Sequence, residues 1–314
     1  MFIFAASDKG GTGRSVTSSN LLYRSALQGN DVCYLDFDFG SPTAGAIFGI
    51  ERAENGITDG TGMHSYLQRT VYQPAKIDVW AETDRPAVRH RPAGAGRLIL
   101  LPGDVGGGDF VDVGGDAVSV KRQALVDQCL DLFLKLNAEF SLCLIDLSAG
   151  RNLAVELALR VTAAPAMRNI TSRWLVFHRW TRQHVVAAGN LVAGPRGLRE
   201  SAEKFGHDPE EFMDNLRFVR TAIIDPTTET QRGLSAKQGI WLHDSNERLN
   251  KLAGDHHVGR SRLLGSVPLD PMLQWQEQLI TDSEVADGIA NPKTRDAFNE
   301  LAGRIVEQKA WETL

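Results

Sequence analysis

The sequence predicts an α/β fold, a doubly wound and mostly parallel sheet of about seven strands with helices on both faces. Short apolar runs of strand character alternate along the chain with stretches whose apolar residues recur at helical spacing. The first run, Phe2–Ala6, passes through a glycine-rich turn into a helix-forming stretch, an order typical of such sheets. No linker rich in proline, glycine or serine divides the 314 residues, of which 42% are apolar, so we expect a single domain over residues 1–314.

Composition argues against several classes of protein, namely polyanion-binding, disulfide-stabilised and membrane-spanning ones. The 34 basic and 39 acidic side chains give a net charge of −5, which argues against a chain-wide field for binding polyanions. Cys33, Cys129 and Cys143 have no C-x-x-C spacing, so we expect buried, reduced thiols rather than disulfides or a metal site. No run reaches the ~20 apolar residues that span a bilayer, and no basic leader precedes the first strand. We therefore expect a cytoplasmic protein.

The glycine-rich turn, Lys9–Gly13, has the composition of a phosphate cradle. Glycine lets several backbone N–H groups point at one anion, and the helix expected over Val16–Leu27 adds the positive end of its dipole. Ser15 stands where such loops place a magnesium ligand. The strict pattern G-x-x-x-x-G-K-[ST] is missed twice, because Asp8 replaces the first glycine and Arg14 replaces the lysine. Phosphate binding is therefore expected, while the chemistry at the site is open.

Carboxylates end two of the strands that follow. The run 31–36 ends in Asp36, and Asp38 follows two residues later, so both side chains point the same way on an extended chain. The run 140–146 ends in Asp146. Because the carboxyl ends of parallel strands face the ligand crevice, we expect these three carboxylates near a magnesium ion and the γ-phosphate. Ordinary turn chemistry is the alternative, since aspartate also ends strands.

The rest of the chain continues the alternation. Further strands are expected at Arg97–Leu101, Trp174–Phe177, Leu216–Val219 and Arg262–Ser266, with helices over Lys121–Leu136, before Val192 and over Thr294–Trp311. The last helix has an apolar stripe suited to core packing, and its balanced charges argue against a membrane partner. Residues 51–97 are rich in proline and arginine and are expected to form a mobile, exposed insertion, with a partner-binding arm as the alternative.

A nucleic acid is another class of partner to weigh. Basic and aromatic side chains that can stack on bases are interleaved over one stretch, namely Arg173, Trp174, Arg179, Trp180, Arg182 and His184. The acidic total instead favours contacts of these residues with nucleotide phosphates or with a second copy of the chain. Nucleic acid is thus possible but not favoured.

Three stretches together resemble the ParA/MinD family of P-loop ATPases with a deviant Walker A motif, which are of the SIMIBI class. Lys9–Ser15 is similar to the family's K-G-G-x-G-K-[ST], Leu35–Gly40 to its D-x-D segment, and Leu144–Gly150 to its Walker B and switch II segment. Their order and separations are similar as well. The arginine in the loop also resembles an actinobacterial set of variant P-loop proteins. The likeness implies a P-loop NTPase fold over most of the chain.

The resemblance further implies a protein that binds ATP and Mg²⁺, forms an ATP-sandwich homodimer and recruits or positions a protein partner. Lys9 would reach the phosphates bound to the other subunit, and Asp38 would orient the attacking water, so that Lys9, Arg14 and Asp38 are the implied catalytic residues. The nucleotide would be held by Gly10, Gly11, Thr12, Gly13, Arg14, Ser15 and Val16. Magnesium would be held by Ser15, Asp36 and Asp146.

Departures from the family pattern leave hydrolysis open. Arg14 can grip phosphate bidentately, but arginine is longer than lysine, and a small displacement can cost orders of magnitude in rate. The Asp8 carboxylate repels a triphosphate unless it pairs with Lys9 or Arg14. Arg220-Thr221 stands where many relatives carry an adenine-binding asparagine, so the base is open too. A switch with slow or impaired hydrolysis, a non-hydrolysing scaffold subunit and an ATP-dependent amidoligase or synthetase all remain hypotheses.

Overall fold

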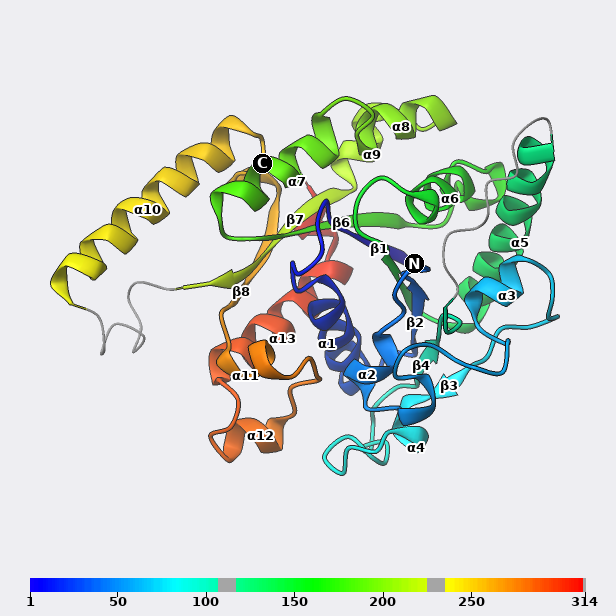
Figure 1. Ribbon diagram of the computed structural model, residues 1–314, viewed down its shortest axis with the longest axis horizontal. Helices are drawn as coiled ribbons and strands as arrows, with labels where there is room; N and C mark the ends of the chain where they lie inside the picture. The colour runs from blue at the N-terminus through cyan, green and yellow to red at the C-terminus, as the bar shows by residue number, and fades with distance from the viewer. Residues whose placement is uncertain (107–116, 225–234, 313–314) are drawn as a thin grey trace.

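A computed structural model describes residues 1–106, 117–224 and 235–312 of the chain (Figure 1). Eight strands join one sheet in the order β3-β4-β2-β5-β1-β6-β7-β8. They are β1 (Phe2–Ala6), β2 (Val32–Phe37), β3 (Ile77–Asp78), β4 (Leu98–Leu101), β5 (Leu142–Leu147), β6 (Ser172–Arg179), β7 (Leu216–Ile223) and β8 (Leu263–Pro268). Every pairing is parallel except that of β3 with β4. The predicted fold class is confirmed, with β3 as an additional edge strand.

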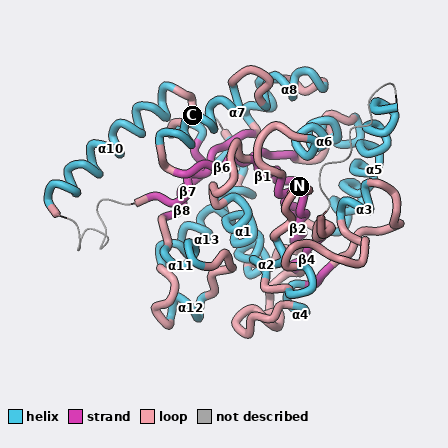
Figure 2. The backbone as a smooth tube through the Cα atoms, viewed as in Figure 1, coloured by secondary structure: helices cyan, strands magenta, loops and turns pink. Residues whose placement is uncertain are grey.

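Thirteen α-helices are assigned within the described residues, and those nearest the sheet cover both of its faces (Figure 2). They are α1 (Arg14–Leu27), α2 (Ala44–Phe48), α3 (Met63–Leu67), α4 (Val79–Glu82), α5 (Ala117–Glu139), α6 (Leu153–Thr162), α7 (Arg182–Ala193), α8 (Leu198–Phe205), α9 (Pro209–Asp214), α10 (Ala236–Asp255), α11 (Pro271–Trp275), α12 (Asp282–Ala286) and α13 (Pro292–Val306).

The core is divided by the sheet into two halves, and β1 shows how. Phe2 and Phe4 pack with residues of α5, α6 and α7, while Ile3 and Ala5 pack with residues of α1, α2 and α13. Successive side chains of a strand point to opposite faces, so a strand covered on both faces reads as a continuous apolar run. This burial is why the first five-residue strand could be recognised from its composition. The three cysteines are buried and free, as predicted.

The segment 51–97 is more deeply packed than predicted. It contributes the edge strand β3 and the short helices α3 and α4. Ile77, Val79 and Trp80 are at most 3% exposed, and the indole Nε1 of Trp80 donates to the carbonyl of Gly96 at 3.0 Å. The expectation of an exposed excursion is therefore wrong for these residues, because their apolar side chains complete the core around α1. Mobility of the segment stays a prediction.

The last helix packs as the sequence predicts. Phe298, Leu301 and Ile305 of α13 are buried against α1 and β8, and Trp311 is buried just beyond the helix, whereas Val306 is 47% exposed. Among the described residues, no helix combines the length and the apolar character needed to cross a membrane.

Candidate functional site

The glycine-rich loop Lys9–Gly13 lies between β1 and α1 at the carboxyl edge of the sheet. Gly11 and Gly13 have φ of 68° and 71°, a left-handed backbone that glycine adopts without strain. A Cβ atom added at Gly10 or Gly11 would meet nothing within 4 Å, so one side of the loop is open. Gly13 caps α1 without a side-chain hydrogen bond, which leaves the first N–H groups of the helix free for an anion.

Arg14 turns from the first position of α1 into the cluster of carboxylates, with only 7% of its side chain exposed. Its Nε donates to Asp146, its Nη2 to Asp38 Oδ2 at 3.3 Å, and its Nη1 to the Ser7 hydroxyl at 3.1 Å. All three guanidinium nitrogens are thus bound to protein oxygens. The arginine is a buried crosslink between the helix and the strand ends, and its predicted contact with phosphate stays a prediction.

Asp36 and Asp146 lie opposite each other in the register of β2 and β5. Asp146 accepts the Tyr34 hydroxyl at 2.6 Å in addition to Arg14, while Asp36 accepts the backbone N–H groups of Asp38 and Ala44. Burial, followed by the charge of Asp146, raises the pKa of Asp36 to about 8. With this pKa the Asp36 carboxyl carries a proton at neutral pH, and Asp146 beside it pairs with Arg14.

This raised pKa predicts a pH dependence of stability. The carboxyl of Asp36 ionises near pH 4 in an unfolded chain and near pH 8 in the fold, so its contribution to stability falls as pH rises between these values. Burial lowers the pKa of His178 to about 4, and its opposite contribution changes only below about 6.5. Asp36→Asn lacks this titrating carboxyl. From pH 6.5 to pH 8, its free energy of unfolding should therefore rise by on the order of 1–2 kcal/mol relative to that of wild type, as measured by urea unfolding without magnesium. Parallel pH profiles of the two proteins would contradict this assignment.

The other predicted residues lie around this cluster rather than in it. Thr12 and Val16 are buried, and Ser15 is half-buried at the start of α1. Lys9 lies on the side facing His184, where its charge adds to burial and to Arg179 in lowering the pKa of that histidine. The structure thus brings Arg14, Asp36, Asp38 and Asp146 together and leaves Lys9 apart from them.

The donor set fits magnesium in part. Among the described residues no three His, Cys, Asp or Glu side chains converge on a metal position. Ser15, Asp36 and Asp146 nevertheless supply the oxygen donors that Mg²⁺ prefers, and this ion usually takes its remaining ligands from water and phosphate. A cation at this place would compete with Arg14 for Asp146.

Asp8 pairs with neither of the partners that the sequence suggested. Its carboxylate binds Nη1 of Arg151 at 3.1 Å. Arg151 follows the Ser148–Gly150 turn after β5, and it also donates to the carbonyls of Asn190 and Arg196. The negative charge of Asp8 is therefore balanced by a residue that follows the turn after β5.

A cavity of about 240 Å³ opens beside the loop, between the ends of β7 and β8 and helix α11. Its wall includes Gly11–Gly13, Arg179, Thr221 and Ala222. The Thr221 hydroxyl donates to the Thr12 carbonyl at 2.5 Å and so fixes the loop to β7. Ala222 has φ of 53°, a strained conformation for a residue with a side chain. The cavity adjoins the first N–H groups of α1. Its location is where the base or ribose of a nucleotide would lie if the phosphates bound these groups.

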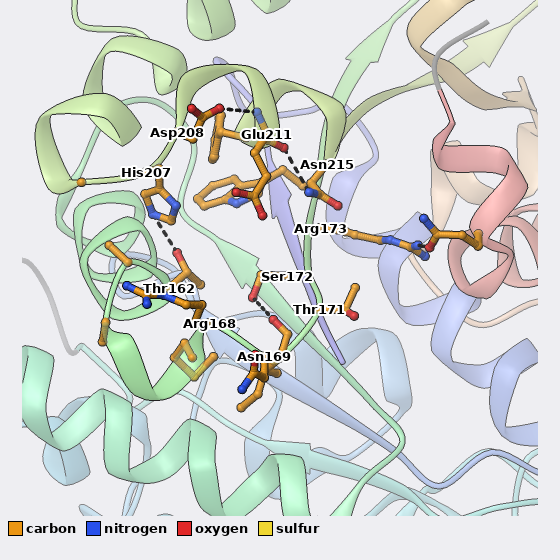
Figure 3. Close-up of a pocket in the computed structure, with 18 residues that line it drawn as sticks. Thr162, Arg168, Asn169, Thr171, Ser172, Arg173, His207, Asp208, Glu211 and Asn215 are labelled. Atoms are coloured by element: carbon orange, nitrogen blue, oxygen red, sulfur yellow. Dashed lines mark hydrogen bonds between the residues drawn. The ribbon is translucent and has the colours of Figure 1, made fainter.

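Another cavity, of about 410 Å³, lies at the opposite edge of the sheet, at the start of β6 (Figure 3). Arg173 lies at its border and donates to the Ile305 carbonyl and the Gln308 side chain, and Trp174 is 1% exposed. These two residues are part of the core and are not available to stack on bases. The prediction that Arg173 and Trp174 belong to a basic and aromatic surface is therefore wrong. Both are buried near the start of β6, whereas Arg179 lies at the other end of this strand.

Sequence reasoning missed several residues of the site. Tyr34 could have been found, since it lies two residues before Asp36 and so points to the same side of β2. Ser7 directly follows β1, where a strand end meets the crevice. Thr221 was singled out only for the base, and neither its bond to the loop nor the contacts of Arg151 left such a signal, because both residues bind backbone carbonyls distant in sequence.

Comparisons with known proteins agree with this fold. No family model and no curated protein matches the chain, but solved structures do. MinD of Pyrococcus horikoshii with Mg-ADP superposes with a TM-score of 0.53 at 16% identity, over 98% of this chain and 96% of that one. The MinC:MinD complex of Aquifex aeolicus has a TM-score of 0.56 at 18% identity, over 97% of this chain and 95% of that one. For pNOB8 ParA bound to nonspecific DNA, the TM-score is 0.54 at 17% identity, over 97% of this chain and 96% of that one. The chain has the fold of the MinD and ParA proteins.

Proposed function

We propose that the chain is a nucleotide-dependent switch that binds ATP with Mg²⁺, dimerises around it and positions a protein partner. The observation that carries the proposal is the uncapped start of α1, which lies beside Arg14 and the Asp36–Asp146 pair. Free N–H groups at a helix start bind phosphate, and the neighbouring cavity has room for the remainder of a nucleotide. The same fold holds Mg-ADP in the Pyrococcus horikoshii MinD structure and is bound to MinC in the Aquifex complex.

Hydrolysis is slow or impaired in this proposal because of Arg14. The guanidinium forms ion pairs with Asp38, the residue expected to orient water, and with Asp146, a residue expected beside magnesium. A γ-phosphate must draw the arginine away from both before either carboxylate is free. A scaffold that binds nucleotide without cleaving it is the second candidate, and the same contacts favour it. Bound magnesium would neutralise phosphate charge, with Ser15, Asp36 and Asp146 holding it.

DNA is the less favoured partner. A ParA protein of this fold binds nonspecific DNA. Here the net charge is −5, and two residues of the candidate DNA surface, Arg173 and Trp174, are in the core. Binding to phosphate backbones depends on accessible positive side chains.

The nucleotide bound by purified protein is the direct test of the proposal. Protein is denatured after purification, the released nucleotide is identified by chromatography, and ATP affinity is measured with and without magnesium. Submillimolar binding of ATP that strengthens with magnesium supports the switch and the scaffold alike. The rate of phosphate release on the same sample then separates the two candidates. Absence of nucleotide binding under all these conditions contradicts both.

Dimerisation is expected to depend on Lys9. Lys9→Ala should abolish an ATP-dependent dimer in gel filtration and change monomer affinity for ATP less than about threefold, because its ammonium lies outside the Arg14 cluster. Lys135→Ala, on the exposed side of α5, is the matched control and should dimerise as wild type does. A wild-type protein that stays monomeric with every nucleotide would refute the dimer.

A further inference from the structure

Helix α10 packs on the rest of the molecule along one face and only toward its end. Ala253 is buried, and Asn246 accepts the indole N–H of Trp180 at 2.7 Å. The start of the helix reaches out beyond the edge of the sheet (Figure 1). It is nevertheless well formed there, because Ser235 and Gln238 make both hydrogen bonds of a capping box. A helical arm therefore stands out from the fold.

This arm carries a stripe of four exposed side chains, which we call the α10 stripe. They are Lys237, Ile240, Trp241 and Asp244. Intervals of three and four residues place them on one face of the helix, and the centre of this face lies about 170° around the helix from Asn246. Ile240 is 64% exposed and Trp241 is 65% exposed. The chain thus leaves most of this apolar surface uncovered.

The charges at the two ends of the α10 stripe are unpaired. In the part of the chain that the structure describes, neither Lys237 nor Asp244 forms an ion pair or a side-chain hydrogen bond. The nearby His243 pairs with Glu247 at 3.6 Å instead. The stripe therefore has a free positive charge at one end, apolar surface in the middle and a free negative charge at the other end. Such an order is complementary to itself when one of two copies is reversed.

We propose that the α10 stripe pairs with the same stripe of a second copy of the chain, with the two helices antiparallel. The twofold axis passes between Ile240 and Trp241. Each Ile240 then meets the other copy's Trp241, and each Lys237 meets the other copy's Asp244, because the members of each pair lie equally far from the axis. A twofold contact needs only one self-complementary surface. A parallel pairing would set like charges against each other, so the charges select the antiparallel one.

The contact is small, since only about two turns of each helix overlap, and a stable interface usually buries more than ~1,000 Å². We therefore expect a dissociation constant of about 10–100 µM. The pairing lies on a different element from the loop Lys9–Gly13 and needs no nucleotide, so it goes beyond the proposed function and does not rest on it.

Sedimentation equilibrium of the full chain without nucleotide, from about 5 to 300 µM, tests the pairing. We expect a monomer–dimer equilibrium whose dissociation constant rises at least about tenfold in Trp241→Ala. Lys237→Glu and Asp244→Lys should each weaken it similarly, because each places like charges opposite one another. Lys251→Glu is the matched control, since this exposed lysine lies on the same helix beyond the overlap, and it should associate as wild type does.

The charge-exchanged double variant Lys237→Glu/Asp244→Lys tests the direction of the helices. Association should return to the wild-type level, because opposite charges face each other again. A double variant as weak as the single ones would contradict the antiparallel pairing.

A wild-type chain that stays monomeric, or whose association is unchanged in Trp241→Ala, would overturn the proposal. So would a monomeric chain that sediments with phosphatidylglycerol vesicles and loses this binding in Trp241→Ala, which would assign the stripe to a lipid surface. Failure of ATP to bind would contradict the proposed function and leave the sedimentation result unaffected.

Discussion

Arg14→Lys should raise ATP turnover by about tenfold to a hundredfold. Lysine is shorter and has a single nitrogen, so it cannot hold Asp146, Asp38 and Ser7 at once, as the guanidinium does. Asp38 is then free to orient water, and the compact ammonium can follow the phosphate. Phosphate release under saturating ATP and magnesium measures the change.

The control for this substitution is Arg24→Lys. Arg24 lies on the same helix, is buried, and forms an ion pair with Asp282 at 2.8 Å, so the change has a similar cost in packing and charge. It lies ten residues from Arg14 along α1 and should leave turnover unchanged. If Arg14→Lys is as slow as wild type, the arginine does not limit hydrolysis, and the slow-hydrolysis account of the site is wrong.

Asp146→Ala should destabilise the fold by about 3–5 kcal/mol. The substitution leaves the buried guanidinium of Arg14 with the neutral Ser7 hydroxyl and the longer Asp38 contact, and it removes the acceptor of the Tyr34 hydroxyl. Relief of the repulsion on Asp36 offsets part of this loss. Urea unfolding gives the change in free energy directly.

A double-mutant cycle separates the ion pair from the packing. Adding Arg14→Met to Asp146→Ala should recover much of the lost stability, because removing both partners of a buried pair leaves no unpaired charge. Asp38→Asn is the matched single change at the more exposed end of the same guanidinium and should cost less than about 1 kcal/mol. An Asp146→Ala cost as small as that of Asp38→Asn would show that the Arg14–Asp146 pair is not buried as described.

The architecture could be predicted largely from the sequence because its strands are covered on both faces. Runs such as Phe2–Ala6 and Leu142–Ile145 are wholly buried and therefore apolar throughout. The edge strand β3 could not be found in this way, since Ile77–Asp78 is too short to form a pattern. Burial of Trp80 in a proline- and arginine-rich stretch likewise depends on tertiary contacts that composition does not report.

The carboxylates of the candidate site could be predicted from the sequence, but the side-chain contacts that they make could not. Strand ends place Asp36 and Asp146 side by side, and this follows from parallel pairing alone. The direction of the Arg14 side chain does not follow from the motif, because a guanidinium at this position can face either phosphate or carboxylates. The pairing of Asp8 with Arg151 joins residues 143 positions apart and has no local signal.

Equilibrium binding of ATP to the wild-type chain, titrated calorimetrically with and without magnesium, tests the central claim most directly. The free N–H groups of α1 and the Arg14 cluster predict saturable binding of one ATP per chain, tighter with magnesium, with the triphosphate recovered largely uncleaved. No binding at millimolar ATP in either condition would contradict the claim that this loop is a phosphate site.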